Sequence, residues 1–218
     1  MDRKQTAWKK SRTFGDVYGG RTSAKIPDRI IKRAHSLHPP GPHDETPLFL
    51  QDNPSRDFYF SLTSNEIRRE LSHLPQRHWS KVTHIWQRRF KKSEYENAEL
   101  PLAEFICGSG VRLIVLYPWP NDLRIPLGAK KPTERFLKSY QDYAPTAEQC
   151  NGQWFLKWEP AAVKDFCVEQ LLYHEVGHHV DFYNRHWSKA NQNAVEEFAN
   201  QYAFERTPKR SICYRNEK

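Results

Sequence analysis

Two histidines and a glutamate stand close together in the segment His174-Glu175-Val176-Gly177-His178, which has the pattern H-E-x-x-H. On an α-helix, residues four apart differ by about 40° in direction and lie one turn above each other, so both imidazoles can reach one ion. Glu175 lies about 60° from His178 around the same axis, so its carboxylate points beside the ion, toward a water bound to it. The alternative is an ordinary helix with two surface or core histidines.

A catalytic zinc ion usually has three protein ligands, so a third ligand is expected further along the chain. The metzincin pattern H-E-x-x-H-x-x-G-x-x-H fails, because Asp181 and Asn184 stand where it needs Gly and His. His186 has the wrong offset, just past the expected end of the helix. The remaining pattern is a glutamate on the next helix, where Glu196 and Glu197 are adjacent.

Glu196 is the predicted third ligand, because Asn200 lies four residues later on the same helix face. The Asn200 side chain can then reach back to the free ring nitrogen of a zinc histidine, which is the support that such ligands usually have. Glu197 points about 100° away from Glu196 and is expected to be a solvated or capping acid.

Other side chains near the motif are candidates for supporting roles. Asp181 lies on the face of the two motif histidines, where it could support a ligand or bond to the nearby backbone. His179 points away from that face and is not expected to be a ligand. If a water on the ion attacks a carbonyl group, a hydrogen-bond donor is needed for the negatively charged oxygen that forms. Three residues could supply this donor, and each could instead be structural: Tyr183, His186 and Tyr202.

The apolar periodicity predicts three helices. Pro160 suits a first helical turn, and the helix that carries the motif is expected over 160–183. A second helix is expected over 193–205, and a third over 63–74 behind the capping box Thr63-Ser-Asn-Glu66. The stripe predicted to be buried on the 160–183 helix comprises Val163, Phe166, Cys167, Gln170, Leu171, His174, His178 and Asp181.

Strands are expected between these helices. The runs 102–107 and 111–117, joined by Gly108-Ser-Gly110, predict a β-hairpin, and 154–158 alternates like a short strand. Residues 82–90 are ambiguous, with β-branched residues favouring a strand. Loops are expected to dominate residues 118–150.

The strand 154–158 raises a question about substrate binding. If it is a free edge above the zinc helix, an extended peptide could add to it as a further strand. The alternative is that Trp154 and Trp158 belong to the core.

The motif His174-Glu-Val-Gly-His178, followed by Glu196-x-x-Ala-Asn200, resembles the gluzincin group of zinc metallopeptidases. It looks closest to compact members such as lethal-factor-like catalytic domains and ImmA/IrrE-like peptidases. The resemblance covers residues 170–206 by motif and 80–206 by order of elements. It implies an α+β, zincin-like fold, with a small mixed or antiparallel sheet packed on the H-E-x-x-H helix and a following helix that bears the glutamate.

The expected activity is hydrolysis of peptide bonds in a protein or peptide substrate, as a metalloendopeptidase. Zn²⁺ held by His174, His178 and Glu196 would lower the pKa of its water toward about 7 and polarise the scissile carbonyl. Glu175 would take the proton as general base and later return it to the leaving amine.

Composition excludes several other classes of protein. The 218 residues are 38% hydrophobic and 13% aromatic, which is enough for the core of one globular domain. No apolar run approaches the ~20 residues of a membrane helix, and the start MDRKQTAWKK has no apolar signal region. The four cysteines are scattered, without a C-x-x-C pair. A cytoplasmic protein with reduced thiols and no membrane contact is therefore expected.

Positive charge is concentrated at the N-terminus. The net charge is +8, and residues 1–33 hold ten Lys or Arg against three Asp, which leaves the rest of the chain nearly neutral with 24 basic and 23 acidic residues. Pro and Gly around His38–His43 break any periodicity. We therefore expect a flexible arm over 1–57, the metallopeptidase domain over 58–208 and a short tail over 209–218.

The basic arm suggests a second class of function, a nucleic-acid-associated or regulatory binding protein that uses the zincin domain as a scaffold. The alternative is that the arm only solubilises the protein or docks on an acidic protein. The residues predicted to contact nucleic acid or an acidic partner are Lys9, Lys10, Arg12, Lys32 and Arg33.

Overall fold

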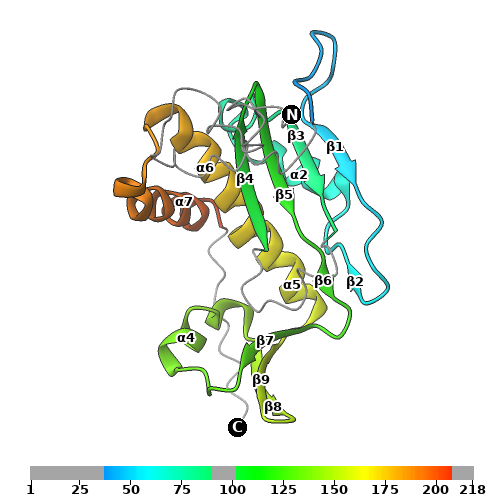
Figure 1. Cartoon of the computed structure of the whole chain (residues 1–218), viewed down its shortest axis with the longest axis vertical. Helices are drawn as coiled ribbons and strands as arrows, with labels where there is room; N and C mark the ends of the chain where they lie inside the picture. The colour runs from blue at the N-terminus through cyan, green and yellow to red at the C-terminus, as the bar shows by residue number, and fades with distance from the viewer. Residues whose placement is uncertain (1–36, 90–101, 208–218) are drawn as a thin grey trace, which may run out of the picture.

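The computed structural model describes residues 37–89 and 102–207, in which helices pack against one mixed sheet and a second, smaller sheet extends from them (Figure 1). The large sheet has the strand order β1-β3-β5-β4. Its strands β1, β3 and β5 run parallel, and β4 pairs with β5 as an antiparallel hairpin. The bounds are β1 Leu48–Gln51, β3 His84–Gln87, β4 Ala103–Gly108 and β5 Val111–Leu116. The predicted hairpin and the strand within 82–90 are thus confirmed.

The central strand β5 is buried on both faces of this sheet. Ile114 and Leu116 belong to the main core beneath the helices, whereas Val111, Leu113 and Val115 belong to a smaller apolar cluster. A continuous apolar run is typical of a strand that is covered on both sides. The mixture of helices and small sheets agrees with the expected α+β class.

Part of the predicted arm belongs to the sheet. Strand β1 pairs with β3, and Leu37 packs against the smaller apolar cluster. A Cβ atom on Gly110 would lie 2.8 Å from the Pro39 side chain, so this segment also touches the β4–β5 hairpin. The boundary predicted at residue 57 is therefore corrected. The segment is ordered by contacts with residues distant in sequence, which its own local pattern does not reveal.

Helix α2 (Ser64–Ser72) begins at the predicted capping box. Glu66 N donates to Thr63 Oγ1 at 3.3 Å, and Thr63 N donates to Glu66 Oε2 at 2.8 Å. Glu66 also forms an ion pair with Lys164 of α5 (Pro160–Phe166). One carboxylate thus caps the N-terminus of α2 and joins this helix to α5.

The predicted helix over 160–183 is continuous but not regular. Between α5 and α6 (Tyr173–Asn184), residues Cys167–Leu172 form a π-helical turn, η3. A π turn has more residues than an α turn, so the residues that face the core no longer follow the regular helical spacing after it begins. Gln170 and Leu171 are consequently only half-buried, contrary to the predicted stripe, and Glu169 and Leu172 are buried instead.

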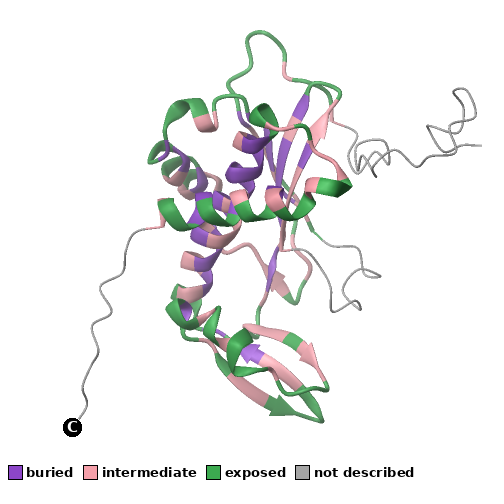
Figure 2. Ribbon diagram, turned by 90° about the vertical axis from the view of Figure 1, so that its left-hand side faces the viewer, coloured by how far each residue is buried: buried purple, intermediate pink, exposed green. Residues whose placement is uncertain are grey.

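Helix α7 (Gln192–Arg206) confirms the second predicted helix and packs against α6. The short 3₁₀ turn η4 (Lys189–Asn191) precedes it, and another, η1 (Gln76–His78), follows α2. The buried side of α7 is formed by Val195, Ala199, Tyr202 and Ala203. In Figure 2 the buried residues gather where the helices meet the large sheet.

Residues 118–150 hold more regular structure than predicted. Together with β9 (Gln153–Lys157) they build an antiparallel sheet of order β7-β9-β8. The other elements of this region are β6 Trp119–Pro120, which pairs with β2 Phe58–Tyr59, and β7 Arg124–Gly128, α4 Glu134–Lys138, η2 Gln141–Tyr143 and β8 Thr146–Cys150. These short strands escape prediction because their residues are largely exposed or half-buried and lack an apolar period.

The predicted peptide-binding edge at 154–158 is wrong. Strand β9 is the middle strand of its sheet, paired on both sides, so it has no free edge for a peptide. Trp158 is buried between Trp119 and Phe166, with ring centroids 5.3 and 4.9 Å away, which confirms its core role. Trp154 is half-buried beneath Lys131.

Within the described ranges, no helix is long and apolar enough to cross a membrane.

Glu66→Gln is expected to lower the free energy of unfolding at pH 7 by about 1 kcal/mol, because Glu66 is both cap and ion-pair partner. The hydrogen bond from Lys164, followed by those from Thr63, lowers the Glu66 pKa from 4.5 to about 2. Its contribution is therefore present above the unfolded pKa and is lost as the pH falls toward 2.

Urea unfolding measured between pH 2 and 7 tests this expectation. The matched control is Glu134→Gln, which removes a first-turn acid of α4 that has no ion pair within the described residues. Equal losses in both variants, or a difference that persists at pH 2, would contradict the assigned role of Glu66.

Candidate metal centre

Three side chains from two helices bring their ligand atoms together. The Nε2 atoms of His174 and His178 lie 3.5 and 3.6 Å from the same Glu196 oxygen, Oε2, and the three ligand atoms fall within 4.8 Å of one another. A tetrahedral ion with bonds of about 2.0–2.1 Å separates its ligand atoms by about 3.3 Å. The cluster therefore has the donor set and nearly the spacing that a metal ion requires.

The close approach of α6 and α7 depends on Gly177. A Cβ atom at this position would lie 2.9 Å from Ala199 Cα, 3.2 Å from Ala199 O and 3.1 Å from Tyr202 Cβ. Two of these atoms belong to the backbone of α7 and cannot rotate away. The glycine inside the H-E-x-x-H motif thus lets α7 approach closely, which places Glu196 against the two histidines on α6.

Burial keeps the His174 imidazole in its neutral form. Desolvation, and then the neighbouring His178, lower the pKa of His174 to about 4, although Glu196 and a hydrogen bond with Asn200 oppose the shift. Asn200 therefore contacts a candidate ligand, as its spacing from Glu196 predicted. Hydrogen bonding from His178 lowers the pKa of Glu196. Neutral imidazole and ionised carboxylate are the forms that bind metal, so both are ready to do so near pH 7.

The His178 ring is fixed by packing. Trp187 lies against it with ring centroids 5.5 Å apart, and the buried His178 Nδ1 has no hydrogen-bond partner while Nε2 faces Glu196. Trp187 Nε1 donates to Asp181 Oδ2 at 2.9 Å, and Arg185 pairs with Asp181 Oδ1 at 3.2 Å. Asp181 therefore acts on this site through Trp187. Sequence reasoning missed Trp187, because the loop between α6 and η4 carries no periodic signal.

Glu175 and His179 have separate places on α6. Glu175, the predicted general base, follows His174 and is buried, with 5% of its surface exposed. His179 is also buried, and its Nδ1 lies 2.8 Å from the His78 carbonyl oxygen, away from the ligand cluster. This agrees with the expectation that His179 is not a ligand. Glu197 is exposed and lies outside the cluster.

The structure gives two of the three candidate oxyanion donors, Tyr202 and Tyr183, other contacts. The Tyr202 hydroxyl lies 2.8 Å from His78 Nδ1 and thereby joins α7 to η1. Tyr183 is partly exposed, with Lys81 Nζ 4.7 Å and the His179 ring centroid 5.3 Å from its own centroid. His186 is exposed in the loop after α6. Tyr202 and Tyr183 thus have packing roles that explain them without catalysis.

The predicted contacts to nucleic acid or an acidic partner lie outside the described residues and stay predictions: Lys9, Lys10, Arg12, Lys32 and Arg33.

Comparisons of this chain with models of protein families, with curated proteins and with solved structures gave no match. What supports a function is therefore the chemistry of the cluster itself. Its two imidazoles and one carboxylate could hold a metal ion.

Gly177→Ala is expected to lower the free energy of unfolding by about 1–3 kcal/mol and to weaken Co²⁺ or Zn²⁺ binding, because the added methyl group forces Glu196 away from α6. In a solvent-exposed helix, where the methyl group meets no neighbour, the same change would stabilise the protein by about 0.5–1 kcal/mol. Urea unfolding of the metal-free protein and titration with Co²⁺ measure the two effects. A stabilised variant with unchanged affinity would show that the helices do not depend on this glycine.

Glu196→Gln is expected to reduce Zn²⁺ affinity by about a hundredfold or more, because it removes the anionic ligand, whereas even the loss of an outer-shell partner costs 10–100-fold. Glu197→Gln is the matched control, one residue away on the exposed side, and should leave the affinity unchanged. Competition titration with a chelating dye compares the two. A larger loss in the Glu197 variant would reverse the assignment of the third ligand.

Proposed function

We propose that this protein is a zinc metalloendopeptidase with a zincin-like domain, in which His174, His178 and Glu196 hold Zn²⁺ and Glu175 is the general base. The observation that carries the proposal is the convergence of Nε2, Nε2 and Oε2 from an H-E-x-x-H helix and the following helix. A chance pair of histidines on one helix would not require a carboxylate from another helix to meet them.

The donor set favours zinc over other common metal ions. Ca²⁺ and Mg²⁺ prefer six or more ligands that are mostly oxygen, whereas two imidazoles and one carboxylate are the ligands of catalytic zinc in several peptidases. Three protein ligands would leave room for a water molecule on a four-coordinate ion. Zinc held by these residues would activate that water and polarise the carbonyl of the scissile bond.

The chain's own residues supply the remaining steps. Glu175 would accept a proton from the attacking water and deliver it to the leaving amine, so that one carboxylate serves both halves of the reaction. Asn200 holds the His174 ring by a hydrogen bond, and Trp187 holds the His178 ring by packing. Such contacts keep the ligands oriented while the substrate binds and leaves.

The architecture is consistent with a zincin-like domain. The mixed sheet places its antiparallel strand β4 beside α6, and Phe105 of β4 lies edge-on to His179, with ring centroids 5.7 Å apart. The sheet thus supports the helix that carries the motif, and the next helix, α7, carries the glutamate. This is the order of elements that the resemblance to gluzincins implies.

Glu175→Gln is expected to retain Zn²⁺ but to lose about 10²–10⁴-fold in the rate of peptide cleavage, because the amide has nearly the same shape and cannot accept a proton. Zinc content is measured by atomic emission after zinc-replete purification, and cleavage by mass spectrometry of an unstructured protein and a peptide library. Glu159→Gln, an exposed acid before α5, is the control.

Two results would overturn the proposal. Less than about half an equivalent of zinc in the metal-replete protein would show that the cluster is not a zinc site. Equal cleavage by the wild-type and Glu175→Gln proteins would show that Glu175 is not the general base.

A further inference from the structure

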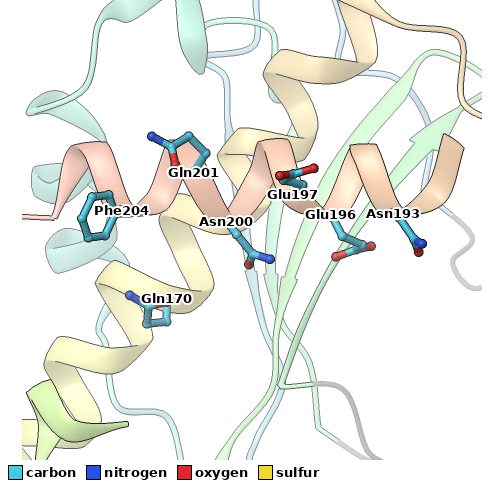
Figure 3. Close-up of a pocket in the computed structure, with 7 residues that line it drawn as sticks. All are labelled: Gln170, Asn193, Glu196, Glu197, Asn200, Gln201 and Phe204. Atoms are coloured by element: carbon cyan, nitrogen blue, oxygen red, sulfur yellow. The ribbon is translucent and has the colours of Figure 1, made fainter. Parts of the chain in front are cut away.

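A groove runs along the exposed side of α7, beginning at the metal centre. It is shallow and largely open to solvent, with a volume of about 630 Å³. Glu196 and Asn200 line it and also belong to the metal centre, so the two sites are continuous. Figure 3 shows Gln170 and Asn200 on the same side of α7, with Phe204 at the end of the helix far from Glu196.

The α7 side of the groove is one face of that helix. Its residues recur at helical spacing outside the buried side of α7, and Glu196 lies at the edge of this face that is next to α6. Gln170 forms the facing wall because the π-helical turn η3 leaves it half-exposed. The α7 residues that line the groove are Asn193, Glu196, Glu197, Asn200, Gln201 and Phe204.

Carboxamides dominate the lining. Gln170, Asn193, Asn200 and Gln201 each carry both donors and an acceptor, the same groups that a peptide backbone presents. Gln201 already donates to Glu205 at 2.9 Å, and Asn200 bonds to His174. Figure 3 shows Asn200 and Asn193 pointing toward the side of α7 on which Gln170 lies, so these carboxamides can hydrogen bond to an extended chain there.

The charge of the groove is negative. Its lining includes Glu196 and Glu197 and no Lys, Arg or His. Once Glu196 binds a metal ion, Glu197 remains as an exposed carboxylate, and it has no ion pair within residues 37–89 and 102–207. A basic side chain close to the scissile bond would complement this charge.

Phe204 provides an apolar contact at the far end. Its side chain is 72% exposed, although large apolar side chains in soluble proteins are mostly covered. It lies eight residues after Glu196, which is about 12 Å along the helix axis. An extended peptide advances about 3.3 Å per residue, so it would reach Phe204 three to four residues from the scissile bond.

We propose that the α7 groove binds the substrate as an extended peptide, with a Lys or Arg beside the scissile bond near Glu197 and an apolar residue about three to four positions away on Phe204. The carboxamides hydrogen bond to the backbone between these two side chains. This proposal rests on the proposed peptidase function and adds a substrate class to it.

Cleavage of a randomised peptide library by zinc-loaded protein tests the preference. Wild type should select a basic residue next to the cut and an apolar residue about three to four positions away, on one side of it. Phe204→Ala should lower the apolar preference about tenfold, and Glu197→Gln the basic preference about threefold. Phe136→Ala and Glu159→Gln, on exposed positions outside the groove, should leave both preferences unchanged.

A binding experiment separates this proposal from the catalytic one. Zinc-loaded Glu175→Gln protein is titrated with fluorescein-labelled peptides that carry one lysine and a leucine about four residues from it. Binding should weaken about tenfold when leucine becomes serine or when Phe204 becomes alanine, but the two losses should not add, because each removes the same contact.

Binding with this dependence supports the groove even if no peptide is cleaved, in which case only the peptidase function fails. Cleavage or binding that is insensitive to Phe204→Ala and Glu197→Gln overturns the groove and leaves the peptidase function intact. A wild-type dimer that Phe204→Ala dissociates would also overturn it, because a second copy of the chain would then cover this face.

Discussion

The contact between α6 and α7 at Gly177 is the constraint on which the rest of the site depends. A single helix can align two histidines, but a third ligand must come from elsewhere, at a distance set by how closely the two backbones approach. Here the absence of one Cβ atom brings the Ala199 backbone to within 2.9 Å of where that atom would lie. The position of Glu196 follows from this contact, because it stands less than one turn before Ala199.

The surroundings of the candidate ligands that this contact brings together then set their protonation states. His174 loses part of its hydration, so it stays neutral, while Glu196 is kept ionised by its neighbours. Orientation comes from outside the cluster, since Asp181 holds Trp187 and Trp187 packs on the His178 ring. The candidate site thus combines a desolvated imidazole, which could bind a metal ion, with a rigid support, and both derive from the packing of α6.

Helix α7 serves two surfaces at once. Its small and apolar side packs on α6, and its polar side lines the groove that leads away from the candidate metal centre. A helix packed tightly on one side has little freedom to tilt, so a substrate bound along the other side is held at a fixed distance from the ligands. The same packing therefore couples the proposed specificity to the proposed chemistry.

Local features of this protein were determined by the sequence alone: the capping box at Thr63, the β4–β5 hairpin and the helix that aligns His174 and His178. Each of these features depends on residues that are near one another in the chain, so the local sequence pattern predicts it. Tertiary structure decided the rest, including the membership of β1 in the sheet, the shifted face of η3 and the meeting of Glu196 with the histidines. Such features depend on which surfaces pack together across long separations, and a local pattern does not contain that information.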